Sequence, residues 1–196
     1  PEVKDIMFYN KGWDKEVYYP WEKIKKIWMK YWDQRKTILM DKTNTNIMRV
    51  TEIKKVFKNI VFLAMVRNPY AQAEGIIRRN DATTEYAAKF ALRCLRYQKI
   101  NKETQKNIFF VSYEDLCDNT EQVIYRIQEF IPELGMIKSD LEFSAHNFKT
   151  KGKMKIQNLN DEKINKLSSK QIQIINSYFK KEEDLLNYFG YSIIES

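Results

Sequence analysis

The chain has 196 residues, of which 43% are hydrophobic, 31% charged and 14% aromatic, which suffices for one well-packed domain of common size. Its five glycines and four prolines exclude collagen-like, linker-like and turn-dense all-β chains. An excess of 34 Lys and Arg over 26 Asp and Glu gives a net charge of +8, which favours an anionic partner: nucleic acid, anionic lipid, nucleotide or acidic glycan.

The composition also excludes several kinds of site. The five glycines, at positions 12, 75, 135, 152 and 190, are too widely spaced for a Walker-type or G-x-G-x-x-G phosphate loop. Cys94, Cys117 and the one histidine, His146, lack the spacing of a zinc site or a disulfide framework, so we expect no metal.

The sequence contains no segment of a membrane-spanning kind. No apolar run approaches the roughly 20 residues that cross a bilayer, and the first residues lack the apolar region of a signal peptide. We therefore expect a cytoplasmic protein, unless a signal or anchor precedes residue 1.

The N-terminal part predicts a helix, a strand and a second helix. Over 21–32, aromatic and aliphatic residues recur at helical spacing with lysines between them, which is typical of an amphipathic helix whose aromatics belong to the core. The apolar run from Thr37 to Met40 predicts a buried strand with Asp41 and Lys42 at its tip. A period near 3.6 predicts a helix over 46–57.

The middle part contains the clearest strand. Residues 60–66 are continuously apolar, as in a parallel strand covered on both faces. The strand ends at Arg67, and Pro69 favours a helix from about 69 to 80 because proline suits the first helical turn. A longer helix is predicted over 84–104, followed by a strand over 108–111 shortly before Tyr113.

The C-terminal part predicts mainly helices. Thr120 and Glu121 begin an amphipathic helix that Pro132 ends. Residues 144–158 are polar and lysine-rich and predict a loop, whereas helical spacing returns over 160–188.

Strands separated by helices predict an α/β fold with a mostly parallel sheet flanked by helices. In such sheets ligands bind beyond the carboxyl ends of the strands. Asp41 and Lys42, Arg67, and Tyr113 would lie there, so we expect three strand ends to meet at one rim.

Each of these side chains has a chemical and a structural interpretation. Arg67 could bind phosphate in a bidentate manner, or it could pair with a carboxylate or cap a carbonyl. Lys42 could stabilise charge on a leaving group, or lie solvated at the surface. Asp41 could accept a proton from an acceptor hydroxyl, or cap a turn. Tyr113 could stack on a base or bond to it, or pack at the rim.

The order of these segments resembles the sulfotransferase family that uses 3′-phosphoadenosine-5′-phosphosulfate. The resemblance covers roughly 150 residues in the order that builds one nucleotide site. The matching stretches are DKTNTN at 41–46, FKNIVFLAMVRNPYAQAEG at 57–75, FFVSYEDL at 109–116, and NLNDEKINKLSSKQI continuing to LLNYFGY, which ends at Tyr191. The resemblance implies a P-loop-NTPase-like fold, with residues 1–196 as a single sulfotransferase-like domain.

The resemblance also assigns roles on the nucleotide side. Arg67 matches the arginine that binds the 3′-phosphate, and Gly75 stands where the family usually has a serine that shares this phosphate, so only a backbone N–H is left there. Tyr113 matches a residue that approaches the adenine. The residues Lys151, Gly152 and Lys153 resemble the family's Arg-Lys-Gly element. In the family this element lies late in the chain, in a loop that closes over the 3′-phosphate.

The resemblance implies transfer of a sulfuryl group to a hydroxyl or amine. The motif at 41–43, Asp-Lys-Thr, resembles the Glu-Lys-Thr/Ser signature of glycan-type sulfotransferases. This resemblance implies a saccharide as the acceptor. It also implies that Asp41 is the general base and that Lys42 is the cation at the leaving oxygen. The cytosolic branch has a histidine two residues after the lysine, where this chain has Asn44. His146 is expected to be a loop residue.

Residues 1–40 contain no turn that fits the family's 5′-phosphosulfate loop. We therefore expect a strand and loop before residue 1 in the full protein, and an uncovered sheet edge without them. Two alternatives stay open: a relative that binds an acidic glycan without transferring sulfate, and a basic module that binds polyanions or nucleic acid. Nucleic acid is the less expected partner, because the aromatics fall on apolar faces rather than among exposed lysines.

Overall fold

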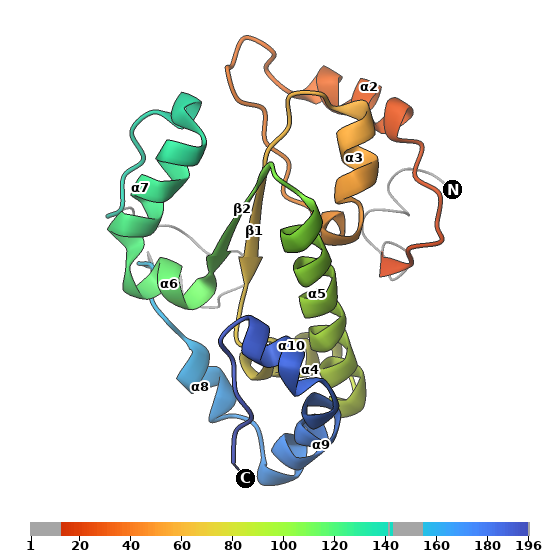
Figure 1. Cartoon of the computed structure of the whole chain (residues 1–196), viewed down its shortest axis with the longest axis vertical. Coiled ribbons are helices and arrows are strands. Elements are labelled where there is room, and N and C mark those ends of the chain that lie inside the picture. Colours follow the sequence, from red (N-terminus) through yellow and green to blue (C-terminus); the bar gives the residue numbers. More distant parts are fainter. Residues whose placement is uncertain (1–12, 141, 143–154, 196) are drawn as a thin grey trace.

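The structure, a computed structural model, describes residues 13–140, 142 and 155–195. Helices surround a small parallel sheet (Figure 1). The helices before the first strand are α2 (Trp21–Tyr31), the short 3-10 helix η2 (Asn44–Met48) and α3 (Val50–Val56). The first crossover unit is β1 (Phe62–Val66), α4 (Pro69–Asn80), α5 (Thr84–Thr104) and β2 (Ile108–Ser112).

Further helices follow β2 and complete the described chain. They are α6 (Tyr113–Asp118), α7 (Thr120–Phe130), η3 (Pro132–Leu134), α8 (Asn160–Ile164), α9 (Ser169–Phe179), η4 (Lys180–Glu182) and α10 (Glu183–Tyr188). No helix in the described part of the chain is both long and apolar enough to cross a membrane.

The two strands pair in parallel, with Val66 opposite Ser112. Because α4 and α5 carry the chain from one strand back to the start of the other, β1 and β2 point toward the same end of the molecule (Figure 1). This arrangement confirms the predicted α/β class. It brings the residues that follow the two strands, Arg67 and Tyr113, to one edge of the sheet.

The predicted strand at Thr37–Met40 is wrong. The segment is irregular and Met40 is 77% exposed. The indole Nε1 of Trp32 donates to the carbonyl of Met40 at 3.2 Å, which is a local contact, and just before the segment Arg35 pairs with Asp33 at 2.8 Å. A strand needs a neighbouring ladder to satisfy its backbone groups, and among the described residues β1 and β2 pair only with each other.

Both faces of β1 were expected to be covered, and this is also wrong for the described residues. Ala64 and Val66 are buried on one face, whereas Leu63 and Met65 on the other are 50% and 46% exposed. All five residues of β1 are apolar, but the described helices bury only the face with Ala64 and Val66.

The other elements follow from their local sequence. The Asn68 side chain caps α4 by accepting from the backbone N–H of Tyr70 at 3.0 Å, and Pro69 occupies the first turn. In α9, Ser168 and Gln171 form a reciprocal capping box. The helix predicted over 46–57 is divided into η2 and α3 at Arg49.

The main core joins distant parts of the chain. Its buried side chains come from β1, α4, α5, α9, α10 and the segment after α10. Tyr70 is fully buried; its hydroxyl donates to Asn176 and accepts from the backbone N–H of Ile194 at 3.2 Å. The C-terminal segment is therefore held against α4 and α9.

A smaller cluster lies between α2 and α3. Trp21 and Ile24 of α2 pack with Ile53 of α3 and with Tyr19. This confirms the prediction that the aromatic stripe of the first helix is core, although Tyr31 at its end is 84% exposed.

Candidate functional site

Arg67 and Tyr113 meet where the two strands end. Val66 and Ser112 are paired in register, and the next residue of each strand is one of these two. The Ser112 hydroxyl starts α6 by accepting from the N–H of Asp115 at 3.0 Å, so the chain turns immediately and Tyr113 stays at the edge. The Arg67 guanidinium carbon lies 4.0 Å from the centroid of the Tyr113 ring, within cation–π distance.

The guanidinium of Arg67 is held from several sides. Its Nε donates to Oδ1 of Asn160 at 2.8 Å. Its Nη2 is buried and has no hydrogen-bond partner among the residues that the structure describes. Within residues 13–140, 142 and 155–195, no carboxylate forms an ion pair with Arg67, so the carboxylate pairing considered from sequence is not what holds it. A buried donor without a partner costs free energy, and an anion would satisfy it.

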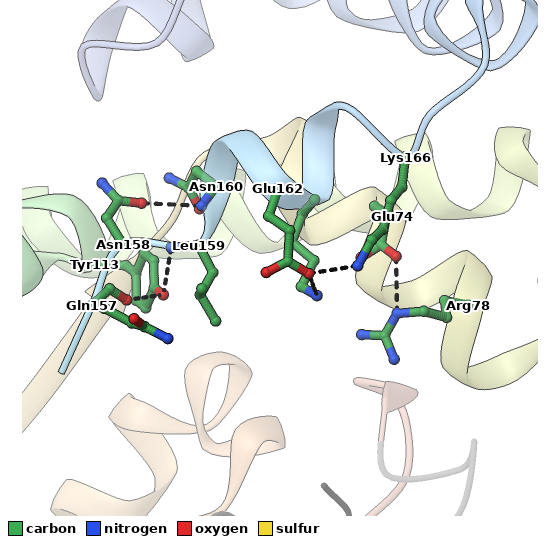
Figure 2. A network of polar contacts seen from close by, with 10 residues as sticks. Glu74, Arg78, Tyr113, Gln157, Asn158, Leu159, Asn160, Glu162 and Lys166 are labelled. Carbon is green, nitrogen blue, oxygen red and sulfur yellow. Dashed lines mark hydrogen bonds and ion pairs between the residues drawn. The ribbon is translucent and has the colours of Figure 1, made fainter. Parts of the chain in front are cut away.

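Tyr113 ties this pair to the segment that leads into α8. Its hydroxyl donates to the carbonyl of Gln157 at 2.8 Å and accepts from the N–H of Leu159 at 3.2 Å, as Figure 2 shows. Burial raises the pKa of Tyr113, with smaller opposing effects from the Leu159 bond and the Arg67 charge. The phenol therefore stays protonated at neutral pH and keeps its donor.

Glu114, directly after Tyr113, binds three donors from different parts of the chain. Its carboxylate accepts from the N–H of Asn68 at 2.8 Å, from Nδ2 of Asn160, and from the hydroxyl of Tyr191 at 3.1 Å. Burial, and then the Glu114 charge, raise the pKa of Tyr191, so this phenol also stays protonated. Glu114 thus joins the start of α4, the start of α8 and the segment after α10.

The sequence interpretation gave no role to Glu114, Asn160 or Tyr191. All three lie inside the stretches that resemble the family, which was the available signal. Their partners are 46 and 77 residues away in sequence, and helical or strand periodicity relates only near neighbours.

Gly75 lies in the interior of α4, beside Arg79. The Nη2 atom of Arg79 lies 3.2 Å from the place that a Cβ at position 75 would take, and its Nε donates to the Gly75 carbonyl at 2.9 Å. Position 75 is past the first turn of α4, so its N–H belongs to the helix ladder. The donor group beside Gly75 is therefore the Arg79 guanidinium.

A second polar cluster lies where α8 packs on α4 (Figure 2). Glu74 is 4% exposed, and its carboxylate accepts from Nε of Arg78 at 2.9 Å, while Oε2 is buried and has no hydrogen-bond partner in the described part of the chain. Glu162 of α8 pairs with Lys163 and Lys166. Each of these ion pairs stays within α4 or within α8 and the residues that follow it, while α8, whose first residue is Asn160, packs on α4.

Asp41 and Lys42 are exposed and lie in the irregular segment before η2. The Asp41 carboxylate accepts from the Thr43 hydroxyl at 3.2 Å and from Nδ2 of Asn46 at 2.9 Å. Asp41 therefore has the turn-stabilising contacts considered from sequence. Two strand ends, those of β1 and β2, meet at the rim. Three were predicted, but residues 13–40 contain no strand that could lead to Asp41.

The other predicted residues add less. Lys151, Gly152 and Lys153, like His146, lie outside the described residues. Burial raises the pKa of the Cys94 thiol to about 11, so it is a protonated core side chain at neutral pH. Across the described part of the chain, no group of three His, Cys, Asp or Glu side chains is placed to hold a metal ion.

Comparison with known proteins adds one match. A family model described as the sulfotransferase family matches residues 14–133, which is more than half of the chain. The matched region contains both strands and, with them, Asp41, Lys42, Arg67, Gly75 and Tyr113. No curated protein and no solved structure matches the chain.

Proposed function

Because the chain belongs to the sulfotransferase family, we propose that it transfers a sulfuryl group from 3′-phosphoadenosine-5′-phosphosulfate to a hydroxyl or amine, with a saccharide as the acceptor class. The observation that carries the donor assignment is the contact of Arg67 with Tyr113 at the ends of two paired parallel strands. In open parallel sheets this edge is where ligands bind.

Arg67 has the properties that a 3′-phosphate requires. Its Nε is occupied by Asn160, and its buried Nη2 lacks a partner, so the two terminal nitrogens are the edge that it presents to phosphate oxygens. Tyr113 supplies an aromatic surface beside this cation for the adenine. Arg79, next to Gly75 in α4, is a second cation. We assign Lys151, Gly152 and Lys153 to the loop that closes over the phosphate.

The transfer itself needs a proton acceptor and a cation at the leaving oxygen. We assign these roles to Asp41 and Lys42. The acceptor oxygen forms a bond to sulfur while the bond from sulfur to the 5′-phosphate oxygen breaks, and adenosine 3′,5′-bisphosphate leaves. Asp41 takes the acceptor proton, and Lys42 neutralises charge on the leaving oxygen. Thr43 and Asn46 orient the Asp41 carboxylate through the bonds described above.

Calorimetry with adenosine 3′,5′-bisphosphate on the full chain tests the donor assignment. We expect saturable binding that Arg67→Ala weakens by about 100-fold, because charge-assisted bonds to phosphate are lost. Arg35→Ala is the matched control, since Arg35 is exposed and, among the described residues, forms an ion pair only with nearby Asp33. If the wild-type chain does not bind, or if Arg67→Ala binds equally well, the donor assignment is wrong.

A second candidate function is binding of an acidic polymer without transfer. A groove of about 790 Å³ between α2 and α3 favours it. The exposed tyrosine and the lysines that line this groove are Tyr18, Lys15, Lys23, Lys26 and Lys55. Three glutamates, at positions 16, 22 and 52, line it too, which weakens the attraction. If heparin binding falls steeply with salt and with Lys23→Ala plus Lys26→Ala, while no nucleotide binds, this candidate replaces the first.

A further inference from the structure

We propose that Asn160 and Glu114 are positioning residues that set the guanidinium of Arg67 for the 3′-phosphate of the nucleotide, an inference that rests on the proposed function. Neither residue contacts the phosphate in this proposal. Each acts through hydrogen bonds that end at Arg67 or at the turn that carries it.

The orientation of the Asn160 amide is fixed by its two partners. Its Oδ1 accepts from Nε of Arg67 at 2.8 Å, and its Nδ2 donates to a carboxylate oxygen of Glu114. A guanidinium can only donate and an ionised carboxylate can only accept, so the flipped amide would lose both bonds. Asn160 is 6% exposed, which leaves water little access as a substitute partner. The Asn160 oxygen is thus committed to Arg67.

Glu114 holds this amide and the turn of Arg67 at the same time. One carboxylate oxygen, Oε1, accepts from both Nδ2 of Asn160 and the N–H of Asn68, the residue after Arg67. The other, Oε2, accepts from the Tyr191 hydroxyl at 3.1 Å. Since the raised pKa keeps Tyr191 protonated, this third donor is present at neutral pH. The carboxylate therefore has fixed partners on both oxygens.

These contacts leave Arg67 one way to bind an anion. Its Nε is used by Asn160 and its face lies on the Tyr113 ring, so rotation about the guanidinium is restricted on two sides. The Nη1 and Nη2 edge remains for a phosphate, in an end-on bidentate geometry; because Nη2 is buried, the groups that cover it must move when the phosphate enters. A cation fixed before the ligand arrives loses less conformational freedom on binding than a free arginine does. Asn160 and Glu114 should therefore affect recognition of the 3′-phosphate more than that of the rest of the nucleotide.

The test compares two nucleotides on the full chain. Adenosine 3′,5′-bisphosphate and adenosine 5′-phosphate differ in the 3′-phosphate, so the ratio of their affinities by calorimetry reports on that group alone. We expect Asn160→Ala to lower this ratio by about tenfold, a size consistent with loss of preorganisation at one charged contact. Asn165→Ala, an exposed asparagine at the other end of α8, should leave the ratio unchanged.

Two further variants separate positioning from folding. Glu114→Gln keeps the shape of the side chain but has one acceptor oxygen: in the place of Oε1 it keeps the bonds to Asn68 and Asn160, and the amide nitrogen then faces the Tyr191 hydroxyl. A neutral oxygen is a weaker acceptor than a carboxylate, so we expect a smaller fall in the same ratio. In an Arg67→Ala background, Asn160→Ala should have no effect on the ratio, because the residue through which it acts is gone. Loss of stability alone would weaken both nucleotides equally and leave the ratio unaltered.

The outcomes distinguish this inference from the function on which it rests. If the wild-type chain does not prefer the 3′-phosphorylated nucleotide, the donor assignment fails and this inference fails with it. If Arg67→Ala removes the preference while Asn160→Ala and Glu114→Gln retain the wild-type ratio, the donor assignment stands and the positioning role is wrong.

Discussion

Arg67 and Asp41, the two charged side chains with central roles in the proposed reaction, lie in different surroundings. Arg67 is partly buried and contacts Asn160 and Tyr113. Asp41 is exposed, and its carboxylate contacts the nearby residues Thr43 and, in η2, Asn46. A side chain fixed by distant partners suits ligand binding, whereas an accessible carboxylate suits proton transfer to a group that arrives from solvent. The two residues should thus affect different kinetic constants.

We expect Asp41→Asn to lower the turnover of sulfuryl transfer by about 100-fold while the affinity for adenosine 3′,5′-bisphosphate stays nearly unchanged. The amide keeps the size of the side chain but cannot take the proton. Steady-state transfer rates and calorimetry measure the two quantities. Asp33→Asn is the control, because Asp33 is also a surface aspartate and, within the described part of the chain, its carboxylate accepts only from Arg35. Unchanged turnover in Asp41→Asn would remove the base assignment.

An ion pair joins two helical elements that are far apart in the sequence, α5 and η4. Arg96 of α5 forms a bidentate ion pair with Glu182 of η4, with Nε at 2.7 Å from the carboxylate. The hydrogen bond from Arg96 lowers the pKa of Glu182, and this outweighs the opposing effect of burial. The pair joins the middle of α5 to the segment between α9 and α10.

This ion pair predicts a dependence of stability on pH. A carboxyl group whose folded pKa is depressed stabilises the fold above its unfolded pKa, about 4.3 for Glu, and loses that contribution as the pH falls through the lower folded value. At pH 7, Glu182→Gln should lower the free energy of unfolding by about 0.5 kcal/mol, a small amount because half of the Arg96 side chain is exposed.

Urea unfolding at several pH values measures this contribution. The difference between the wild type and Glu182→Gln should shrink as the pH falls below about 4 toward the lowered folded pKa, because the wild-type carboxyl then takes up a proton and loses its charge. Glu133→Gln, which changes an exposed glutamate of η3, should show no such trend. A difference that stays constant down to acid pH would mean that the ion pair contributes nothing.

At the scale of the whole molecule, the core extends beyond the region that matches the family model. The match ends at residue 133, yet the main core includes Leu167, which precedes α9, and buried side chains of α9 and α10 such as Ile175, Phe179 and Leu186. These pack on α5 and close the α4 and α5 face. Glu114 likewise needs Asn160 and Tyr191 from the later part. The fold and the candidate site both depend on the C-terminal helices.

We expect a chain of residues 14–133 to lack a cooperative unfolding transition. Truncating one large buried side chain costs about 2–5 kcal/mol, and loss of α9 and α10 removes several, against a total stability of about 5–15 kcal/mol. Thermal unfolding followed by circular dichroism measures it, with a chain of residues 1–195 as the control. A sharp transition for 14–133 near that of the control would contradict the dependence.

Much of the fold could be predicted from local pattern. The 3.6-residue period located α2, α5 and the C-terminal helices, and Pro69 located the start of α4. The apolar runs located β1 and β2, and the rule on carboxyl ends brought Arg67 to Tyr113. The strand at Thr37–Met40 failed because an apolar run gives the propensity of a strand but not its hydrogen-bonding neighbour. The site roles themselves stay predictions until the variants are measured.

The sequence alone determined where α4, α5 and the two strands lie and which side chains follow each strand, since periodicity, capping and proline geometry act over a few residues. Tertiary structure alone decided that Asn160 meets Arg67 and that Glu114 joins Asn68 to Tyr191. It also left one face of β1 half exposed and Asp41 outside the sheet. The physical reason is that hydrogen bonds between residues far apart in the chain depend on how the helices pack. The pairing of particular residues from different helices leaves no period in the sequence.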